Sequence, residues 1–316
     1  MSYAQYGLIE AADFNNLVGG NPVTTSGKLN TVWATGGTTA GYGQTAVANV
    51  TAGSTVTASN WASLINNTAN AATHQGSSIT SVTAPSSGGT ITYLSAIPTN
   101  LTTIYTNRLN AGTQGSTTAN TATYATTWSS ALTFTHTATF ANGDAARYFF
   151  NSGGQLAITC SHPNGTGINL LLNNLASNIG TVVLSAPTSG TATIAGTAYN
   201  GITKVGGGGN APTTSPNTGY YALTTANATV FTQTASTGPS GYLSTFIRVI
   251  IKSNGTQGSN GDAGSVITIY TVWDEVPDGL TAAANSATTL TIRPPETTNL
   301  ANSWGSITLT GTVTGS

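Results

Sequence analysis

Residues 131–140 read ALTFTHTATF, and threonine occupies every second position from 133 to 139. In an extended chain successive side chains point to opposite sides, so Leu132, Phe134 and His136 would share one face. This period of two is typical of a half-buried β-strand. Similar Thr- and Val-rich segments follow at intervals of roughly 8–12 residues, with turn residues between them, which predicts an antiparallel β-sandwich.

The most apolar of these segments are 242–253, YLSTFIRVIIKS, and 265–276, SVITIYTVWDEV. The residues between them are rich in Gly, Asn and Asp, which favour turns, so we expect a hairpin. One segment breaks the strand pattern. Residues 168–180, INLLLNNLASNIG, fit either a helix or an apolar loop that crosses one end of a sheet.

The N-terminal third has a different periodicity. Apolar residues recur three and four positions apart in 56–76, the spacing of one buried helix face, and the stretches 8–18 and 98–110 also predict helices. We therefore expect a mainly β protein in which a small helical module precedes an antiparallel β-sandwich domain. The expected parts are the helical N-terminal module, residues 1–110, a linker, residues 111–123, and the β-sandwich, residues 124–316.

Charge is nearly absent from the chain: 5% of the residues are charged and the net charge is −1. This composition gives no electrostatic reason to expect nucleic acid as a partner, and weak self-repulsion favours association between copies. The aromatic residues, 5 Trp, 12 Tyr and 7 Phe, argue against disorder. The N-terminal residues lack the pattern of a secretory signal, and the sequence has no long apolar run, so we expect no membrane insertion.

Residues with catalytic or metal-binding chemistry are few and scattered. The three histidines are far from one another in sequence, which predicts no local metal pair, and Cys160 lies in an apolar run. The sequence contains no G-x-S-x-G motif and no P-loop. We expect no cofactor and no enzymatic activity. The carboxylates that fit either solvated turns or a Ca²⁺ site, and on which a hydrolase would have to draw, are Asp262, Asp274, Glu275 and Asp278.

Residues 140–154, FANGDAARYFFNSGG, are unusual here because an acid and a base lie three positions apart beside three aromatic residues. An active site, a partner-binding surface and a structural corner could each use such a cluster. We favour the corner, in which Asp144 caps a helical turn at 145–150 and Arg147 pairs with Asp144 or with backbone carbonyls. The Gly pair at 153–154 would then reverse the chain. One or two of the aromatic residues would plug the end of the sandwich: Tyr148, Phe149 and Phe150.

Two stretches resemble virion structural proteins of tailed bacteriophages, especially marine cyanophages. The second of them, residues 140–154 preceded by Trp128, resembles a segment of phage tail and fibre-type proteins. The first resembles an N-terminal module of virion proteins. It includes Asp13-Phe14-Asn15, Val32-Trp33-Ala34-Thr35-Gly36, Gly41-Tyr42-Gly43-Gln44, Trp61-Ala62-Ser63-Leu64 and His74-Gln75-Gly76.

The resemblance implies a non-enzymatic structural subunit of a tail appendage or fibre, made in the host cytoplasm and located in the virion. Its partners would be other virion proteins and copies of itself, with a trimer favoured because fibres are commonly trimeric. In this hypothesis the N-terminal module docks through Trp33, Tyr42 and Trp61, and the β-sandwich is displayed. A neck or capsid-surface decoration protein is an alternative. A receptor- or glycan-binding module is another, with these rings stacking on sugars: Tyr220, Tyr221, Tyr242 and Trp304.

Overall fold

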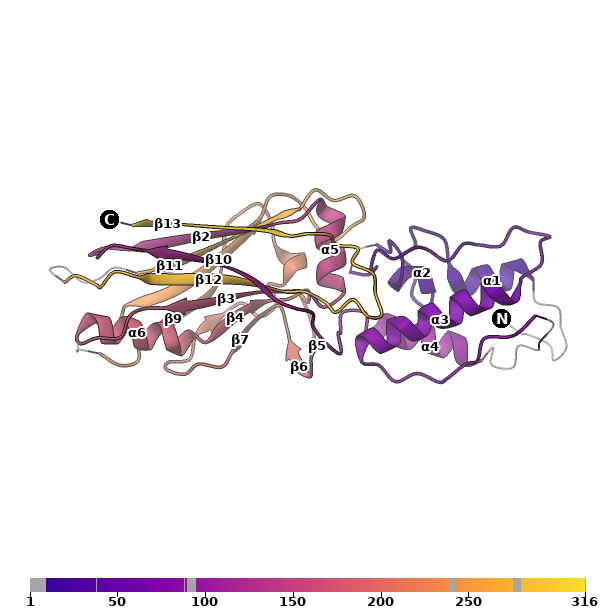
Figure 1. Cartoon of the computed structure of the whole chain (residues 1–316), viewed down its shortest axis with the longest axis horizontal. Helices are drawn as coiled ribbons and strands as arrows, with labels where there is room; N and C mark the ends of the chain where they lie inside the picture. Colours follow the sequence, from indigo (N-terminus) through magenta and orange to yellow (C-terminus); the bar gives the residue numbers. More distant parts are fainter. Residues whose placement is uncertain are drawn as a thin grey trace.

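The structure, a computed structural model, describes residues 10–37, 39–87, 89, 95–238, 242–274 and 280–315. The molecule is elongated, with helices at one end and a β-sandwich at the other (Figure 1). The prediction of a mainly β chain, with antiparallel sheets preceded by a few helices, is confirmed.

The N-terminal part is built from the helices α1 (Ala11–Val18), α2 (Leu29–Val32), α3 (Ala58–Gln75) and α4 (Ala96–Thr106). The longest, α3, begins and ends close to the predicted limits. The hydroxyl of Thr57 accepts a hydrogen bond from the backbone N–H of Asn60, and the Asn60 side chain accepts one from the backbone N–H of Thr57. Gly76 ends the helix in the left-handed conformation, which glycine adopts without steric cost.

The helices bury one face each around an aromatic centre. The ring of Phe14 on α1 meets Trp61 of α3 edge to face, with 5.5 Å between the ring centroids. Leu300, from the opposite end of the sequence, is buried in the same cluster. The segment around Leu300 therefore belongs to the core of the helical part although it follows most of the β-strands.

The β part contains two large antiparallel sheets and one short hairpin. Its strands are β1 (Thr118–Tyr124), β2 (Leu132–Thr139), β3 (Gln155–Ser161), β4 (Thr181–Leu184), β5 (Ala192–Ile194), β6 (Thr197–Tyr199), β7 (Ile202–Val205), β8 (Thr213–Thr214), β9 (Ala228–Thr234), β10 (Phe246–Ser253), β11 (Val266–Trp273), β12 (Ser286–Arg293) and β13 (Thr308–Gly315). The five-stranded sheet has the order β1-β12-β3-β4-β7 and the six-stranded sheet the order β13-β2-β11-β10-β9-β8. The hairpin pairs β5 with β6.

Strand β2 has the alternation that its sequence predicts. Its alternate residues from Leu132 to Ala138 are buried in the sandwich core, and the threonines between them lie half-buried on the outer face. The neighbouring strand β13 pairs with β2 in a register that places threonine opposite threonine. The hydroxyl groups of Thr137 and Thr310 lie 2.6 Å apart, so side-chain hydrogen bonds join the two strands as well as the backbone ladder.

Two helices cover the ends of the sandwich. Residues 168–180, for which the sequence left a helix and a loop open, form the helix α6 (Ile168–Ile179), which buries Leu171, Leu172 and Leu175. The helix α5 (Gly143–Asn151) lies where the sandwich meets the helical part (Figure 1). A 3₁₀ turn, η1 (Tyr220–Ala222), packs behind α5.

The expectation of a linker at residues 111–123 is corrected by the structure. Ala111 forms a parallel bridge with Ile194, Gln114 forms an antiparallel bridge with Pro295, and β1 already begins at Thr118. The sequence around 111–123 does not reveal these pairings, because the partner residues are distant in sequence.

Candidate functional site

The helix α5 carries the acid, the base and the aromatic residues of 140–154, and its first turn differs from the prediction. Asn142, and not Asp144, caps the helix, because its side-chain oxygen accepts a 2.8 Å hydrogen bond from the backbone N–H of Ala145. The helix starts at Gly143, where a Cβ atom would lie 1.9 Å from the carbonyl oxygen of Asp262. Asp144 therefore lies within the first turn, and its carboxylate is free to meet side chains.

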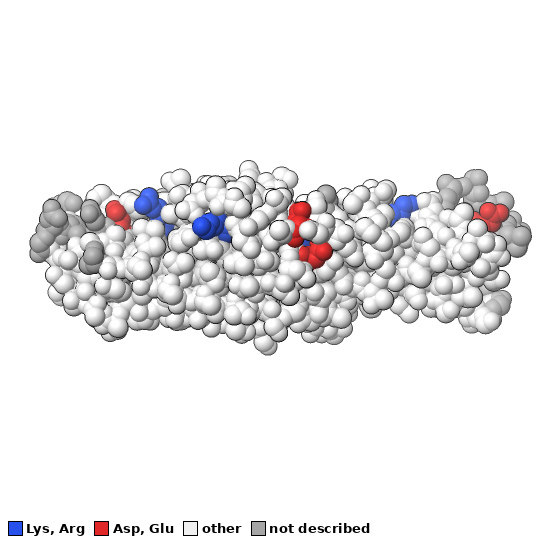
Figure 2. All heavy atoms as spheres, turned by 90° about the horizontal axis from the view of Figure 1, so that it is seen from above, with Lys and Arg blue, Asp and Glu red and all other residues white. Residues whose placement is uncertain are grey.

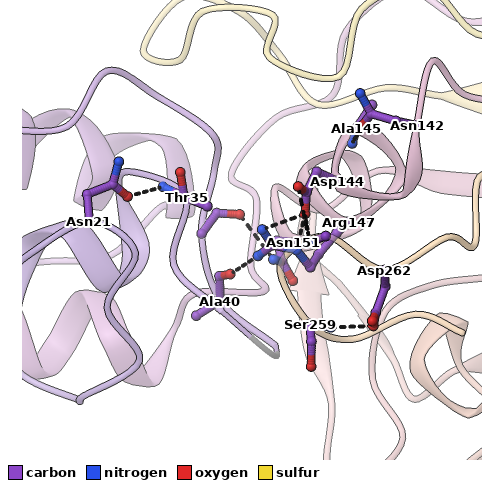
Figure 3. Close-up of polar contacts among 12 residues, drawn as sticks. Asn21, Thr35, Ala40, Asn142, Asp144, Ala145, Arg147, Asn151, Ser259 and Asp262 are labelled. Carbon is purple, nitrogen blue, oxygen red and sulfur yellow. Dashed lines mark hydrogen bonds and ion pairs between the residues drawn. The ribbon is translucent and has the colours of Figure 1, made fainter.

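Arg147 is fully buried and joins the two parts of the molecule. Its Nε and Nη2 atoms donate hydrogen bonds of 3.2 and 3.0 Å to Asp144 Oδ1, which confirms the expected pair. Its Nη1 atom donates a 2.7 Å hydrogen bond to the backbone carbonyl of Ala40 in the helical part (Figure 3). The guanidinium carbon also lies 4.8 Å from the centre of the Tyr148 ring.

Asn151 and a further hydrogen bond to Asp144 complete this contact. We call Asp144, Arg147 and Asn151 the α5 clasp. Asn151 Nδ2 donates a 3.0 Å hydrogen bond to the carbonyl of Gly41, and its Oδ1 accepts one from the Tyr221 hydroxyl. Asp144 accepts a hydrogen bond from the backbone N–H of Gly261. One turn of helix therefore holds two consecutive carbonyl groups of the helical part, at Ala40 and Gly41.

The loop held by the α5 clasp is the Gly41-Tyr42-Gly43-Gln44 motif. Tyr42 is buried, its hydroxyl donates to the carbonyl of Arg108 at 2.9 Å, and it accepts a 2.7 Å hydrogen bond from Gln75 Nε2. Burial raises the pKa of Tyr42, so the phenol stays protonated. Gly43 has a positive φ of 68° and lies against the Tyr148 ring, where a Cβ atom would come within 2.4 Å.

The segment after β12 holds the other side of the same loop. Gln44 and Ala301 exchange two hydrogen bonds of 2.8 Å, one from the Gln44 side-chain amide and one from the Ala301 backbone. The Ser303 hydroxyl donates to the carbonyl of Tyr42. The loop is therefore bound on one side by α5 and on the other by residues 301–303.

A second polar contact joins α3 to the β part through His74. Its Nε2 atom lies 3.0 Å from the carbonyl of Ser152, and its Nδ1 atom lies 3.5 Å from Glu296 Oε1. Burial lowers the pKa of His74, and the nearby carboxylate opposes that shift only in part. Burial also disfavours the ionised form of Glu296, but hydrogen bonds from Asn299 and Thr298 and the proximity of His74 outweigh it and lower its pKa to about 2.

Aromatic residues fill the space behind α5, as expected for a plug at the end of the sandwich. Phe150 stacks on Tyr220 with centroids 4.2 Å apart and planes 14° from parallel. Phe149 meets Phe140 at 5.3 Å and Trp304 at 6.5 Å. Phe149 and Phe150 are thus core residues, which confirms that part of the prediction, while Tyr148 is half-buried between Gly43 and Arg147.

This packing corrects the glycan-contact prediction. The rings of Tyr220 and Trp304 are buried in the sandwich core and present no face to a sugar. Tyr221 is half-buried and uses its hydroxyl to hold Asn151, while Tyr242 is half-buried at a different place in the fold. These four side chains do not form one sugar-stacking surface.

The aromatic residues expected to dock the helical part are also buried. Trp61 and Tyr42 are core residues, and Trp33 is 7% exposed with its indole N–H donated to the carbonyl of Thr45. Their large apolar surface stabilises the helical part itself, so the docking prediction for these three rings is corrected.

The carboxylates considered for catalysis or Ca²⁺ binding do not converge in the described part of the chain. Asp262 accepts a 2.7 Å hydrogen bond from the backbone N–H of Ser259 and stabilises a turn (Figure 3), while Asp274 lies at the end of β11. Glu275 and Asp278 lie outside the described residues. Among the residues that are described, no three His, Cys, Asp or Glu side chains form a group able to hold a metal ion.

The histidines and the cysteine contribute to packing. His136 lies 2.8 Å from the Thr288 hydroxyl, and His162 lies 2.8 Å from the Ser286 hydroxyl. Burial lowers the pKa of both imidazoles and raises the pKa of the Cys160 thiol to about 12. In the described ranges, no helix is long and apolar enough to cross a membrane.

Sequence reasoning missed the acceptors and the second carboxylate of this junction. Ala40 and Gly41 contribute only backbone carbonyls, for which the sequence carries no signal, and Glu296 is distant in sequence from His74. A search of protein-family models, of curated proteins and of solved structures found no match.

Proposed function

We propose that the chain is a non-enzymatic structural subunit of a tailed-phage virion, in a tail appendage or fibre-type protein. Its helical part would dock on the particle, and its β-sandwich would be displayed. The observation that carries the proposal is the contact between the two stretches that resemble phage virion proteins. Asn151 of the second binds the carbonyl of Gly41, which begins the Gly41-Tyr42-Gly43-Gln44 motif of the first, and Arg147 binds the carbonyl of the preceding residue, Ala40.

This contact supports a structural role because it fixes one end of the molecule relative to the other. A subunit that docks at one end and displays the other needs a defined geometry between the two ends. Buried, hydrogen-bonded groups at the junction provide that geometry, because separating the parts would leave Arg147 and the Ala40 carbonyl without partners.

The distribution of charge also supports the proposal. Figure 2 shows a face on which charged side chains are few and most of the surface is uncharged. Such a surface repels copies of itself weakly and favours assembly. The partly buried carboxylate and the buried guanidinium of the junction are bound to the chain itself, so they are engaged in structure rather than directed toward a substrate.

The proposal is tested by locating the chain in the particle of the phage that encodes it. Antibodies raised against the purified chain should label intact virions at the tail, and an intact-particle reconstruction should contain the elongated two-part shape with the helical end innermost. Virions purified free of host lysate that lack the chain, as judged by mass spectrometry with a capsid protein as the internal reference, would overturn it. Labelling confined to the capsid surface or neck would reassign the chain to a decoration role.

A further inference from the structure

The edge strands on the two sides of the β-sandwich differ in length and in residue type. On one side the edges are β7, which has 4 residues, and β8, which has 2. Lys204 of β7 donates a 2.9 Å hydrogen bond to Gln233 Oε1 of β9, so its side chain ties the two sheets together. Pro212 and Pro216 flank β8. Short strands, a lysine and prolines are the devices that keep an edge from pairing with another chain.

The opposite side has no short strands, lysines or prolines at its edges, and there the two edge strands pack closely against each other across the sandwich. Its edge strands are β1 with 7 residues and β13 with 8, and neither contains a proline or a charged residue. Strand β13 pairs with β2 along one edge, and within the described residues no strand is paired with its other edge. In Figure 1 it forms the upper margin of the sandwich. A long, uncharged edge of this kind can form a backbone ladder with another chain.

The residues of β13 are also arranged symmetrically. From position 308 to 314 they read Thr-Leu-Thr-Gly-Thr-Val-Thr, with Gly311 at the centre. The four threonines are exposed, whereas Leu309 and Val313 are half-buried toward the core. An antiparallel pair of two such strands, centred on Gly311, would place every threonine opposite a threonine and each Leu opposite a Val.

We infer that β13 is the surface through which two copies of this chain pair, antiparallel and about a two-fold axis at Gly311. Thr310 would lie opposite the partner's Thr312, and Leu309 opposite the partner's Val313. The inference rests on the proposed function in so far as that function includes association between copies. The proposed function leaves the contact between copies unspecified. The inference assigns that contact to one strand, β13, and to one register.

Cross-strand threonine pairs of the kind that this pairing would form already occur within the chain. Thr137 and Thr310 share a hydrogen bond of 2.6 Å between β2 and β13, and Thr121 and Thr289 share one of 2.8 Å between β1 and β12. A second copy would extend the threonine rows of the six-stranded sheet without a break. Cross-strand threonine pairs of this kind stabilise antiparallel sheets.

The occupant that fits this edge best is a second copy rather than a different protein. The edge carries no charge that would select a partner of opposite sign, and its own sequence complements it when read in the antiparallel direction. Strand β1, which lies beside β13 in the other sheet, exposes only small side chains, so it permits close approach. Those residues are Thr118, Ala119, Thr121 and Thr123.

Charge placed on the two central threonines tests the pairing. In the double variant T310K/T312K each lysine would face a lysine across the two-fold axis, so we expect at least a tenfold rise in the dimer dissociation constant by light scattering and analytical ultracentrifugation. In T310E/T312K each glutamate would face a lysine, so dimerisation should return to the wild-type level. Both variants change the same exposed positions, and equal thermal unfolding midpoints would show that both fold.

Cysteine pairing tests the register. An equimolar mixture of T310C and T312C chains should oxidise to a disulfide-linked heterodimer, because directly opposite positions meet the geometry of a disulfide. Either variant alone should stay uncrosslinked. Crosslinking of T310C with itself would overturn the register, and a wild-type chain that is a monomer, or a trimer unaffected by T310K/T312K, would overturn the pairing.

These outcomes separate this inference from the proposed function. A chain found in virions whose self-association ignores the β13 substitutions keeps the proposed function and loses the two-fold pairing. A chain that dimerises through β13 but is absent from purified virions keeps the two-fold pairing and loses the proposed function.

Discussion

Arg147 Nη1 donates a 2.7 Å hydrogen bond to the carbonyl oxygen of Ala40, a residue 107 positions earlier in the chain. The same guanidinium binds Asp144, and both parts of the molecule surround it. A buried cation therefore connects the helical part to the sandwich.

Replacing Arg147 with alanine should destabilise the chain by about 3 kcal/mol, because the partly buried Asp144 carboxylate and the Ala40 carbonyl lose their partner. Urea unfolding followed by circular dichroism measures the change. Arg293→Ala is the matched control. Arg293 is half-buried on β12, and within the described residues its side chain has no hydrogen bond or ion pair. Its replacement should therefore change the stability by no more than about 0.5 kcal/mol. Equal effects of the two substitutions would contradict the role of the α5 clasp.

Gly43→Ala should destabilise the folded chain by more than the backbone strain of a positive φ alone. The added Cβ would come within 2.4 Å of the Tyr148 ring, on top of a left-handed strain of about 1–2 kcal/mol. Gly27 has a similar φ of 74° with open space around it, so Gly27→Ala should show only the strain. Tyr148→Ala in the Gly43→Ala background should recover the excess, and thermal denaturation of the four chains would reveal whether it does.

Stability should fall as the pH drops below about 6.5. Burial lowers the pKa of His74 in the folded chain below the ordinary value of 6.5, so the unfolded chain binds more protons in this range. The contribution of His74 is complete above the ordinary value and is lost as the pH falls through the folded pKa. Glu296, with its pKa lowered from 4.5 to about 2, adds a second loss below pH 4.5.

Thermal unfolding from pH 8 to pH 5 checks this dependence. Each such group changes stability by at most about 1.4 kcal/mol per pH unit. His136 and His162 are shifted in the same direction, so His74→Gln should flatten the curve only in part. An identical pH dependence in the wild type and in His74→Gln would show that His74 does not contribute.

The Cys160 thiol should be inert in the folded chain. Burial raises its pKa from 9.0 to about 12, which lowers the thiolate population at pH 8 by about a thousandfold relative to an exposed thiol. Reaction with a coloured disulfide reagent should therefore be slow in buffer and fast in denaturant. A rapid stoichiometric reaction in buffer would mean that the reagent reaches the half-buried Cys160 side chain and that its pKa is not raised.

Local sequence patterns predicted helices and strands such as α3 and β2 well, because alternation, apolar spacing and capping act between residues that are close in sequence. The alternation in ALTFTHTATF gave β2, and the spacing of apolar residues with a capping threonine and a terminal glycine gave α3. The segment 168–180 had an apolar pattern shared by helices and buried loops, and only its packing on the sandwich decides for the helix α6.

The candidate site was predicted only where its members are close in sequence. Asp144 and Arg147 lie three positions apart, and their pair was expected. The helix is capped by Asn142 and not by Asp144, because Gly143 packs against Asp262 from a distant loop. For the same reason composition could not separate buried rings from exposed ones. Tyr220 and Trp304 are covered by residues of α5, which lie far from them in sequence.

The Gly41-Tyr42-Gly43-Gln44 loop lies between α5 and residues 301–303. Because it is attached on both sides, tension between the helical end and the sandwich passes through several backbone carbonyls at once instead of along one flexible strand. The bonds share the load, and no single one has to break before the others are engaged. A pull on the molecule would thus be resisted by several hydrogen bonds at the junction together.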